Sequence, residues 1–351
     1  MKILLLTHSF NSLTQRLFEE LTVRGHDLSV EFDIADSVAE EAVALFRPDV
    51  VLAPFLKRAI PASIWSRVLC LIVHPGIVGD RGPSALDWAI QSGAAEWGVT
   101  VLQAEAEMDA GPVWASAGFA MRPARKSSLY RNEVTEAAVG AVLEALSRVD
   151  DWRAGRWQPR RLAEGGRWQP PMRQPDRAID WARDDTAAIL ARLRAADGSP
   201  GVADRLFGVP CQIFDAHPAP AAGGSTPGDV IARRDGALLR ATRDGAVWIG
   251  HVRRGDRDGA FKLPATVAFA AESAHLPERP APLWREPGGA DGEGAELAYR
   301  EEAGGEVGIL SFEFYNGAMA TDQCRRLQAA IGFARSRPTR VLVLEGGADF
   351  W

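Results

Sequence analysis

The stretch Cys70-Leu-Ile-Val-His-Pro-Gly-Ile-Val-Gly-Asp-Arg-Gly-Pro-Ser84 decides the fold of the first part of the chain. It opens in an apolar run, Val68 to Val73, which is typical of a buried strand. The run breaks at His74-Pro-Gly76, because proline lacks an N–H group and glycine admits positive φ. A helix is expected from Ala85 onward. The stretch therefore predicts a histidine at the carboxyl end of a buried strand, the edge of an open α/β sheet where ligands bind.

A second segment makes His74 a candidate catalytic residue. Gly98 to Gln103 reads as another strand, and a turn-rich loop with Asp109 follows it. A lone histidine more often has a packing role, but a histidine and an aspartate that each follow a strand end can meet over one crevice. A neighbouring carboxylate fixes the imidazole tautomer and suits it to proton transfer at neutral pH.

The first 149 residues alternate between strand and helix patterns. Strands are predicted at Lys2–Thr7, Asp27–Phe32 and Asp49–Leu52, and helices at Leu13–Arg24 and Asp36–Phe46. This alternation predicts an α/β domain with a doubly wound parallel sheet. The first strand is followed by no Gly-x-Gly-x-x-Gly motif and the chain has no Walker A loop, which disfavours nicotinamide and nucleoside triphosphate cofactors.

Two further positions near the predicted sheet edge could contact a ligand. Gln15 lies on the first turn of its helix, where it is either exposed or a binding residue. The run from Arg125 to Arg131 carries three cations and two serine hydroxyls before a helix predicted at Asn132–Leu146. Cations oppose the dipole of a helix N-terminus unless an anion is bound. An anion site and a solvated helix start both remain open here.

The remaining chain divides into further predicted parts beyond the domain at 1–149. Residues 150–176, in which Gly-Arg-Trp-Gln-Pro occurs twice, are predicted to form a crossing segment that could fold as a hairpin. Short strands with Gly/Asp turns indicate a small β-barrel over 177–276. A linker rich in Pro, Gly and Glu is expected at 277–296. A strand, a helix and a strand are expected within 297–351, too few elements to close a core of their own.

Composition limits the class of protein. A net charge of −6 argues against nucleic acid as a partner. Three widely spaced cysteines indicate reduced thiols in the cytoplasm and provide neither a disulfide framework nor a zinc-binding pattern. No apolar run approaches the length that spans a membrane, and the apolar start is too short for a signal peptide. We therefore expect a cytoplasmic enzyme that acts on small molecules and has no metal site.

The two loop segments resemble the active-site signature of the tetrahydrofolate-dependent formyltransferases. The resemblance implies that His74 and Asp109 are catalytic and that Arg81 and Gly82 belong to the folate-side loop. The family usually has an asparagine two residues before the histidine, where it binds the formyl oxygen. This sequence has Ile72 there, which disfavours transfer to an amine or requires a backbone N–H for the oxyanion. The pattern of 177–276 resembles the second, barrel-shaped domain of the same enzymes.

The order of the parts resembles the HypX/HoxX family of hydrogenase maturation factors, in which formyltransferase domains precede a crotonase-like (enoyl-CoA hydratase/isomerase) domain. The loop from His74 to Ser84 and the segment Asn316-Gly-Ala-Met…Gln-Cys324 carry this resemblance. It implies formyl transfer from N10-formyltetrahydrofolate to coenzyme A, followed by decarbonylation to the carbon monoxide ligand of [NiFe] hydrogenase. Hydrogenase maturation proteins are the implied partners. The crotonase-like part is expected to be incomplete, so that the decarbonylation half is missing.

In the leading hypothesis His74 takes the thiol proton of coenzyme A and returns one to N10 of the folate, while Asp109 holds the imidazole. Gln15 would bind the pantetheine amides and Arg131 a phosphate. Three alternatives stay open. They are hydrolysis by a water that His74 activates, a non-catalytic folate-binding assembly module, and formylation of an amine, which Ile72 and the acidic composition disfavour.

Overall fold

The computed structural model describes residues 1–162, 166–220, 224–285 and 295–347. The chain divides into two compact units, Met1–Met172 and Arg173–Trp351. The boundary between them falls inside the predicted crossing segment. The finer division predicted from the sequence stays a prediction, and residues 286–294 of its linker and 348–351 of its last part lie outside the described residues.

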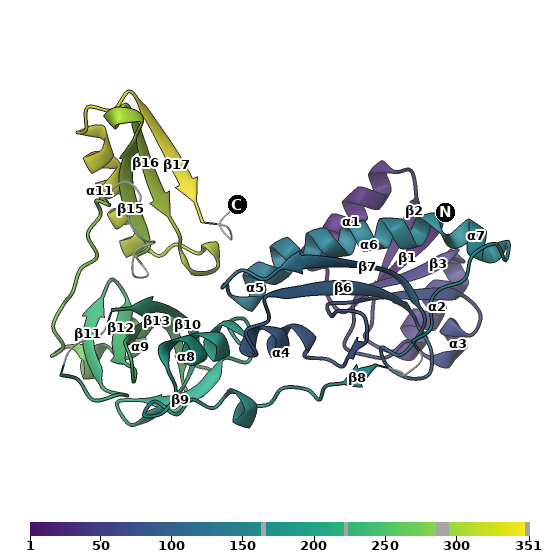
Figure 1. The fold of residues 1–351 in the computed structure, drawn as a ribbon, viewed down its shortest axis with the longest axis horizontal. Coiled ribbons are helices and arrows are strands. Elements are labelled where there is room, and N and C mark those ends of the chain that lie inside the picture. Colours follow the sequence, from purple (N-terminus) through teal and green to yellow (C-terminus); the bar gives the residue numbers. More distant parts are fainter. Residues whose placement is uncertain (163–165, 221–223, 286–294, 348–351) are drawn as a thin grey trace. The chain divides into compact units, whose positions relative to one another are not determined.

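The first unit is built on a six-stranded sheet with the order β2-β1-β3-β4-β6-β7 (Figure 1). The first four strands are mutually parallel, as the doubly wound prediction requires. The last two run antiparallel to their neighbours, so the sheet is mixed and not wholly parallel. The strands are β1 (Lys2–Thr7), β2 (Asp27–Phe32), β3 (Val50–Phe55), β4 (Leu69–His74), β6 (Glu96–Gln103) and β7 (Val113–Ala120).

Helices cover this sheet through apolar faces with helical spacing. In α1, Leu13, Leu17 and Leu21 are buried at intervals of four residues, and the Asn11 side chain caps the helix by accepting a hydrogen bond from the Thr14 N–H at 3.0 Å. Figure 1 shows α6 lying along β6 and β7. The helices are α1 (Ser12–Val23), α2 (Asp36–Phe46), α3 (Ala62–Trp65), α4 (Ala85–Gln91), α5 (Lys126–Leu129), the π-helix η1 (Tyr130–Val134), α6 (Thr135–Ser147) and α7 (Val149–Arg153).

The segment after α7 does not form the predicted hairpin within its described residues. Instead the short strand β8 (Arg167–Trp168) pairs in parallel with β5 (Asp80–Arg81), which lies in the loop after His74. Trp157 packs against the fully buried Trp114, with ring centroids 5.1 Å apart. The crossing segment is therefore tied to the loop that carries the candidate site.

The second unit begins with an antiparallel sheet in the order β11-β12-β13-β10-β9, with β14 paired to β13. The sheet is made of short strands, as the sequence predicts for 177–276. Helix α8 begins at Thr186, because Asp185 caps it by accepting a hydrogen bond from the Ala188 N–H at 2.8 Å. The elements are η2 (Gln174–Arg177), α8 (Thr186–Arg194), β9 (Val202–Leu206), β10 (Val209–Ala219), β11 (Val230–Arg234), β12 (Ala237–Ala241), β13 (Ala246–Arg254), β14 (Leu263–Pro264), α9 (Ala265–Ala268) and α10 (Ala270–Ser273).

The last part of the second unit is a three-stranded sheet with one long helix. Strand β15 (Leu297–Glu302) runs antiparallel to β16 (Val307–Phe312), which is parallel to β17 (Val341–Gly346). Two short 3₁₀ helices, η3 (Ala303–Gly305) and η4 (Tyr315–Gly317), and α11 (Thr321–Arg335) complete it. Strand β16, helix α11 and strand β17 are the strand, helix and strand that the sequence predicts, and β15 is a further strand that was not predicted. None of the helices in the described ranges is long and apolar enough to cross a membrane.

Candidate active site

His74 is the last residue of β4 and is buried between two carboxylates. Its Nε2 atom lies 3.0 Å from Oδ2 of Asp80, and its Nδ1 atom lies 3.6 Å from Oδ2 of Asp109. His74 is 4% exposed and Asp80 is 7% exposed. A neutral imidazole can donate to only one of the two carboxylates, whereas the imidazolium form can donate to both. The arrangement is therefore suited to hold and deliver a proton.

The prediction that Asp109 meets His74 is confirmed, but the route by which it was expected to do so is wrong. Because β6 is antiparallel to β4, Gln103 lies beside Leu71, and Thr100 lies beside His74. The loop after β6 thus starts near the opposite end of β4 and has to return to reach the histidine. The Gly82 N–H holds the returned loop by donating to Oδ2 of Asp109 at 3.1 Å.

Arg81 and Gly82 bind the loop that carries Asp109. Arg81 donates from Nε to the Met108 carbonyl oxygen at 3.2 Å and from Nη2 to Glu107 at 2.7 Å. Gly82 has φ of +113°, and a Cβ there would lie 2.1 Å from the Gln169 carbonyl oxygen, so only glycine fits. Both residues thus position the loop that carries Asp109. Their contact with folate stays a prediction.

Asp80 is a site residue that the sequence reasoning missed. Its Oδ1 accepts a hydrogen bond from Nε2 of Gln169 at 2.7 Å, which leaves Oδ2 aimed at His74. Gly76 makes the room, since a Cβ at this position would lie 2.4 Å from Nε2 of His74 and 2.6 Å from Oδ2 of Asp80. The sequence does contain a glycine and an aspartate in the loop after His74, which could have indicated this contact. A loop has no periodicity, however, from which the direction of a side chain could be predicted.

Ile72 lies two residues before His74 on β4, and alternation along a strand places both side chains on the same face. Ile72 is partly buried and packs against the apolar cluster that contains Cys70 and Ala104. The position is therefore apolar and close to the candidate site. Its role in binding a substrate remains a prediction.

Gln15 and Arg131 lie on two elements that contact each other. Gln15 is exposed on α1, and its Nε2 donates to the Phe10 carbonyl oxygen at 2.8 Å. Arg131 lies in the π-helix η1, whose first residue, Tyr130, accepts a hydrogen bond from Asn11 at 3.3 Å. Burial raises the pKa of the Tyr130 hydroxyl to about 12, so it stays protonated in this contact. Local π-helices are frequent at functional sites, and the ligands of both residues stay predictions.

Within the described ranges, no group of three or more His, Cys, Asp and Glu side chains is placed to hold a metal ion. The chemistry that the candidate site can perform with its own side chains is proton transfer.

Comparison with known proteins identifies two domain types. Residues 22–146 match the formyl transferase family model, and residues 171–260 match the model for the formyl transferase C-terminal domain. A methionyl-tRNA formyltransferase of Burkholderia multivorans is 27% identical over 236 residues, which cover 65% of this chain and 70% of that protein. The predicted formyltransferase domains are therefore present.

Two relatives match the chain over nearly its whole length. The hydrogenase maturation factor HoxX of Bradyrhizobium diazoefficiens is 55% identical over 354 residues, which cover 100% of this chain and 60% of that protein. The crystal structure of HypX from Aquifex aeolicus in complex with tetrahydrofolic acid is similar with a TM-score of 0.91 and 44% identity, covering 99% of this chain and 60% of that one. The chain thus spans about 60% of the length of these relatives.

Proposed function

Because the chain belongs to the HypX/HoxX family over the stretch of those proteins that it spans, we propose that it transfers a formyl group from N10-formyltetrahydrofolate to coenzyme A. The observation that carries the proposal is the buried His74, which lies between Asp80 and Asp109 at the carboxyl end of β4. This histidine lies inside the segment that matches the formyl transferase model. The tetrahydrofolic acid in the HypX crystal structure supports folate as the carrier.

The residues of the site fit the needs of the donor, which supplies the formyl group when bound. Its nitrogen must gain a proton as the bond to the formyl carbon breaks. His74 in its imidazolium form can give that proton, since the two carboxylates hold the ring and stabilise its charge. Gly82 and Arg81 keep the Asp109 loop in place.

The apolar Ile72 supports a thiol as the acceptor. An isoleucine side chain cannot donate a hydrogen bond to the formyl oxygen, so the carbonyl is less polarised than in enzymes with an asparagine there. A thiolate is intrinsically a strong nucleophile and needs less polarisation than an amine. In this proposal Gln15 binds the pantetheine amides of coenzyme A and Arg131 binds a phosphate.

The product formyl-CoA would be the source of the carbon monoxide ligand in [NiFe] hydrogenase. The decarbonylation step would belong to a crotonase-like part, of which β15, β16, α11 and β17 form the start. The hydrogenase maturation proteins would be the partners that receive the product. This role rests on the relatives named as hydrogenase maturation factors.

The test is to incubate the chain with N10-formyltetrahydrofolate and coenzyme A and to follow formyl-CoA. His74→Ala and Asp109→Asn should each slow transfer by about 10²- to 10⁴-fold, as loss of a proton-transfer group does. Asp27→Asn, an exposed position at the start of β2, is the matched control for the amide substitution. Formate release at the same rate without coenzyme A would indicate a hydrolase. Folate binding without turnover, unchanged in His74→Ala, would indicate a binding module.

A further inference from the structure

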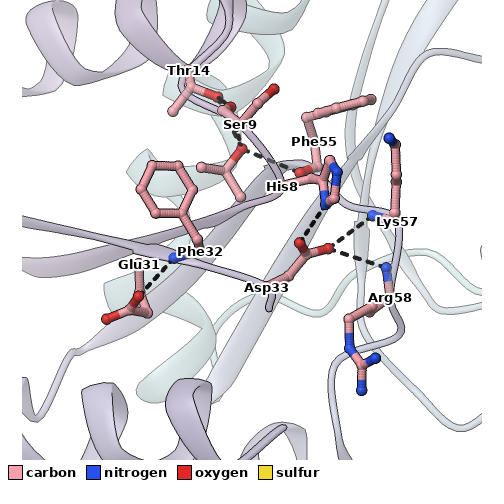
Figure 2. Close-up of polar contacts among 10 residues, drawn as sticks. His8, Ser9, Thr14, Glu31, Phe32, Asp33, Phe55, Lys57 and Arg58 are labelled. Carbon is pink, nitrogen blue, oxygen red and sulfur yellow. Dashed lines mark hydrogen bonds and ion pairs between the residues drawn. The ribbon is translucent and has the colours of Figure 1, made fainter. Parts of the chain in front are cut away.

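A second histidine–carboxylate pair lies at the same edge of the sheet as His74. The Nδ1 atom of His8 lies 2.7 Å from Oδ1 of Asp33, as Figure 2 shows. His8 directly follows β1 and Asp33 directly follows β2. The Asp33 side chain is 5% exposed and that of His8 is 36% exposed. The pair thus consists of a buried carboxylate and an imidazole that reaches the surface.

The strand register explains why these two residues meet. Strands β1 and β2 pair in parallel from Lys2 beside Asp27 to Thr7 beside Phe32. Continuing this register by one residue places His8 beside Asp33, with both side chains on one face. The pair is therefore built into the sheet and does not depend on a long loop.

Hydrogen bonds fix the Asp33 carboxylate in an orientation that faces His8. Its Oδ2 accepts hydrogen bonds from the backbone N–H groups of Lys57 at 2.9 Å and Arg58 at 3.1 Å (Figure 2). Burial alone would raise the pKa of the Asp33 carboxyl, but the hydrogen bonds from Lys57, His8 and Arg58 together lower it. The ionised carboxylate accepts the Nδ1–H of His8. In the neutral ring this leaves Nε2 as a hydrogen-bond acceptor.

The pair lies where a second substrate can approach His74. Strand β3 lies between β1 and β4, so the backbones of β1 and β4 are about 10 Å apart. Thr7 lies beside Phe55 after a register shift in the pairing of β1 with β3, and β3 pairs with β4 up to Ala53 beside Ile72, two residues before His74. The connections from β1 and from β3 lead to opposite sides of the sheet, which makes this edge a topological switch point.

Alternation also places the two histidines on one face of the sheet. His8 continues the row of Leu4 and Leu6, and His74 continues the row of Cys70 and Ile72. Leu4, Leu6 and Cys70 belong to one apolar cluster, and Ile72 packs against it. His74, however, already faces a carboxylate at each ring nitrogen, so an incoming thiol would have to displace one of them. His8 offers its Nε2 without such a displacement.

We propose that His8, oriented by Asp33, accepts the thiol proton of the acceptor, which leaves His74 to protonate the donor nitrogen; this inference rests on the proposed function. The S–H bond breaks and its proton passes to Nε2 of His8. The sulfur forms a bond to the formyl carbon, the bond from that carbon to the donor nitrogen breaks, and the nitrogen takes a proton from His74. His8 then releases a proton to water and His74 takes one up. No oxidant or reductant is required.

The experiment compares His8→Gln with the wild-type chain in formyl transfer to coenzyme A between pH 6.5 and 9.5. Glutamine can still bond to Asp33 but cannot accept the proton. The reference pKa of a cysteine thiol is about 8.5, and the thiol of the acceptor is protonated at the lower pH and increasingly ionised toward the upper. Of the charged groups near the pair, Asp33 contacts His8 directly, and the side chain of Arg58, which is ion-paired with Asp36, interacts with Asp33. We expect a loss of roughly 100-fold or more in kcat at pH 6.5, shrinking below about 10-fold at pH 9.5.

His26→Gln, a histidine at the other end of the sheet just before β2, is the matched control and should leave the rate unchanged at every pH. Asp33→Asn should show a smaller loss with the same pH trend, and folate binding and thermal melting report whether each variant is folded. A loss below about threefold, or one independent of pH, in a folded His8→Gln variant of an active chain overturns the inference alone. A wild-type chain that makes no formyl-CoA overturns the proposed function and the inference together.

Discussion

At the scale of single residues, the contact between His74 and Asp80 is possible because residue 76 is a glycine and has no side chain. A side chain there would begin 2.4 Å from the imidazole and 2.6 Å from the carboxylate. Gln169 holds the far oxygen of Asp80, so the carboxylate cannot retreat without losing that hydrogen bond. The glycine thus belongs to the site although it has no side chain to react.

Gly76→Ala should therefore damage the site more than the fold. We expect transfer to fall by at least about 10-fold, because a displacement of reacting groups by 1 Å can cost about 10²-fold, and thermal melting to show a smaller change. Gly140→Ala is the control, since Gly140 lies in α6, a methyl group added there would have nothing within 4 Å, and the variant should gain up to about 1 kcal/mol in stability. Equal activity in both variants would mean that the His74–Asp80 contact is not used.

The buried Asp33 should make stability depend on pH in a definite direction. Its pKa is lowered in the folded state from the ordinary value of 3.8. Its contribution is therefore fully present above that value and is lost as the pH falls through the folded pKa. Urea unfolding of the wild type and Asp33→Asn should differ most near pH 7 and converge in acid. A constant difference between pH 7 and the acid range would contradict this assignment.

The residues that could be predicted were those at the ends of regular elements. His74 ends a buried apolar run, and its place at the sheet edge followed from that run. Asp80 could not be placed, because its direction depends on Gln169, which lies 89 positions further along the chain. Contacts over such a separation leave no periodic pattern in one sequence.

At the scale of elements, the strand β6 shows where the prediction failed. Alternating strands and helices predict a parallel sheet, but β6 follows the short helix α4 and turns back beside β4. Nothing in the apolar run of β6 distinguishes the two directions, since a buried strand is apolar in either. The reversal moves the start of the Asp109 loop to the far end of β4, and the loop returns to the site, where Gly82 and Arg81 hold it.

Arg131 lies in the π-helix η1, which contacts α1, and its proposed role concerns the acceptor coenzyme A. If Arg131 binds a phosphate of coenzyme A, Arg131→Ala should raise the apparent KM for coenzyme A by roughly ten- to hundredfold, the worth of a charge-assisted contact of about 1.5–3 kcal/mol. Folate binding should change little, and Arg131→Lys should recover part of the loss. Exposed Arg67 provides the control, as Arg67→Ala. Equal weakening for folate and coenzyme A would assign Arg131 to the fold.

At the scale of the whole molecule, each compact unit contains one buried cysteine. Cys70 lies in the first unit and Cys211 in the second, and burial raises the pKa of each thiol to about 12. Cys324 is exposed. The thiolate is the reactive form, so the three cysteines report separately on the two units and on the surface.

A thiol reagent at pH 8 should therefore label Cys324 in the native chain and leave the other two cysteines unmodified. Both should become reactive in denaturant. Mass spectrometry of peptides from the labelled chain reads out each site. Rapid labelling of Cys70 without denaturant would contradict the packing of β4, and rapid labelling of Cys211 would contradict that of β10.

Isotopic transfer shows whether this chain passes a formyl group to a thiol, as proposed above. The chain is mixed with N10-formyltetrahydrofolate labelled in the formyl carbon, with and without coenzyme A, and the label is followed by chromatography. We expect label in formyl-CoA, one equivalent for each tetrahydrofolate formed, and loss of this product in His74→Ala. Label that appears only in formate, or at an equal rate in folded His74→Ala, would rule out the proposed transfer.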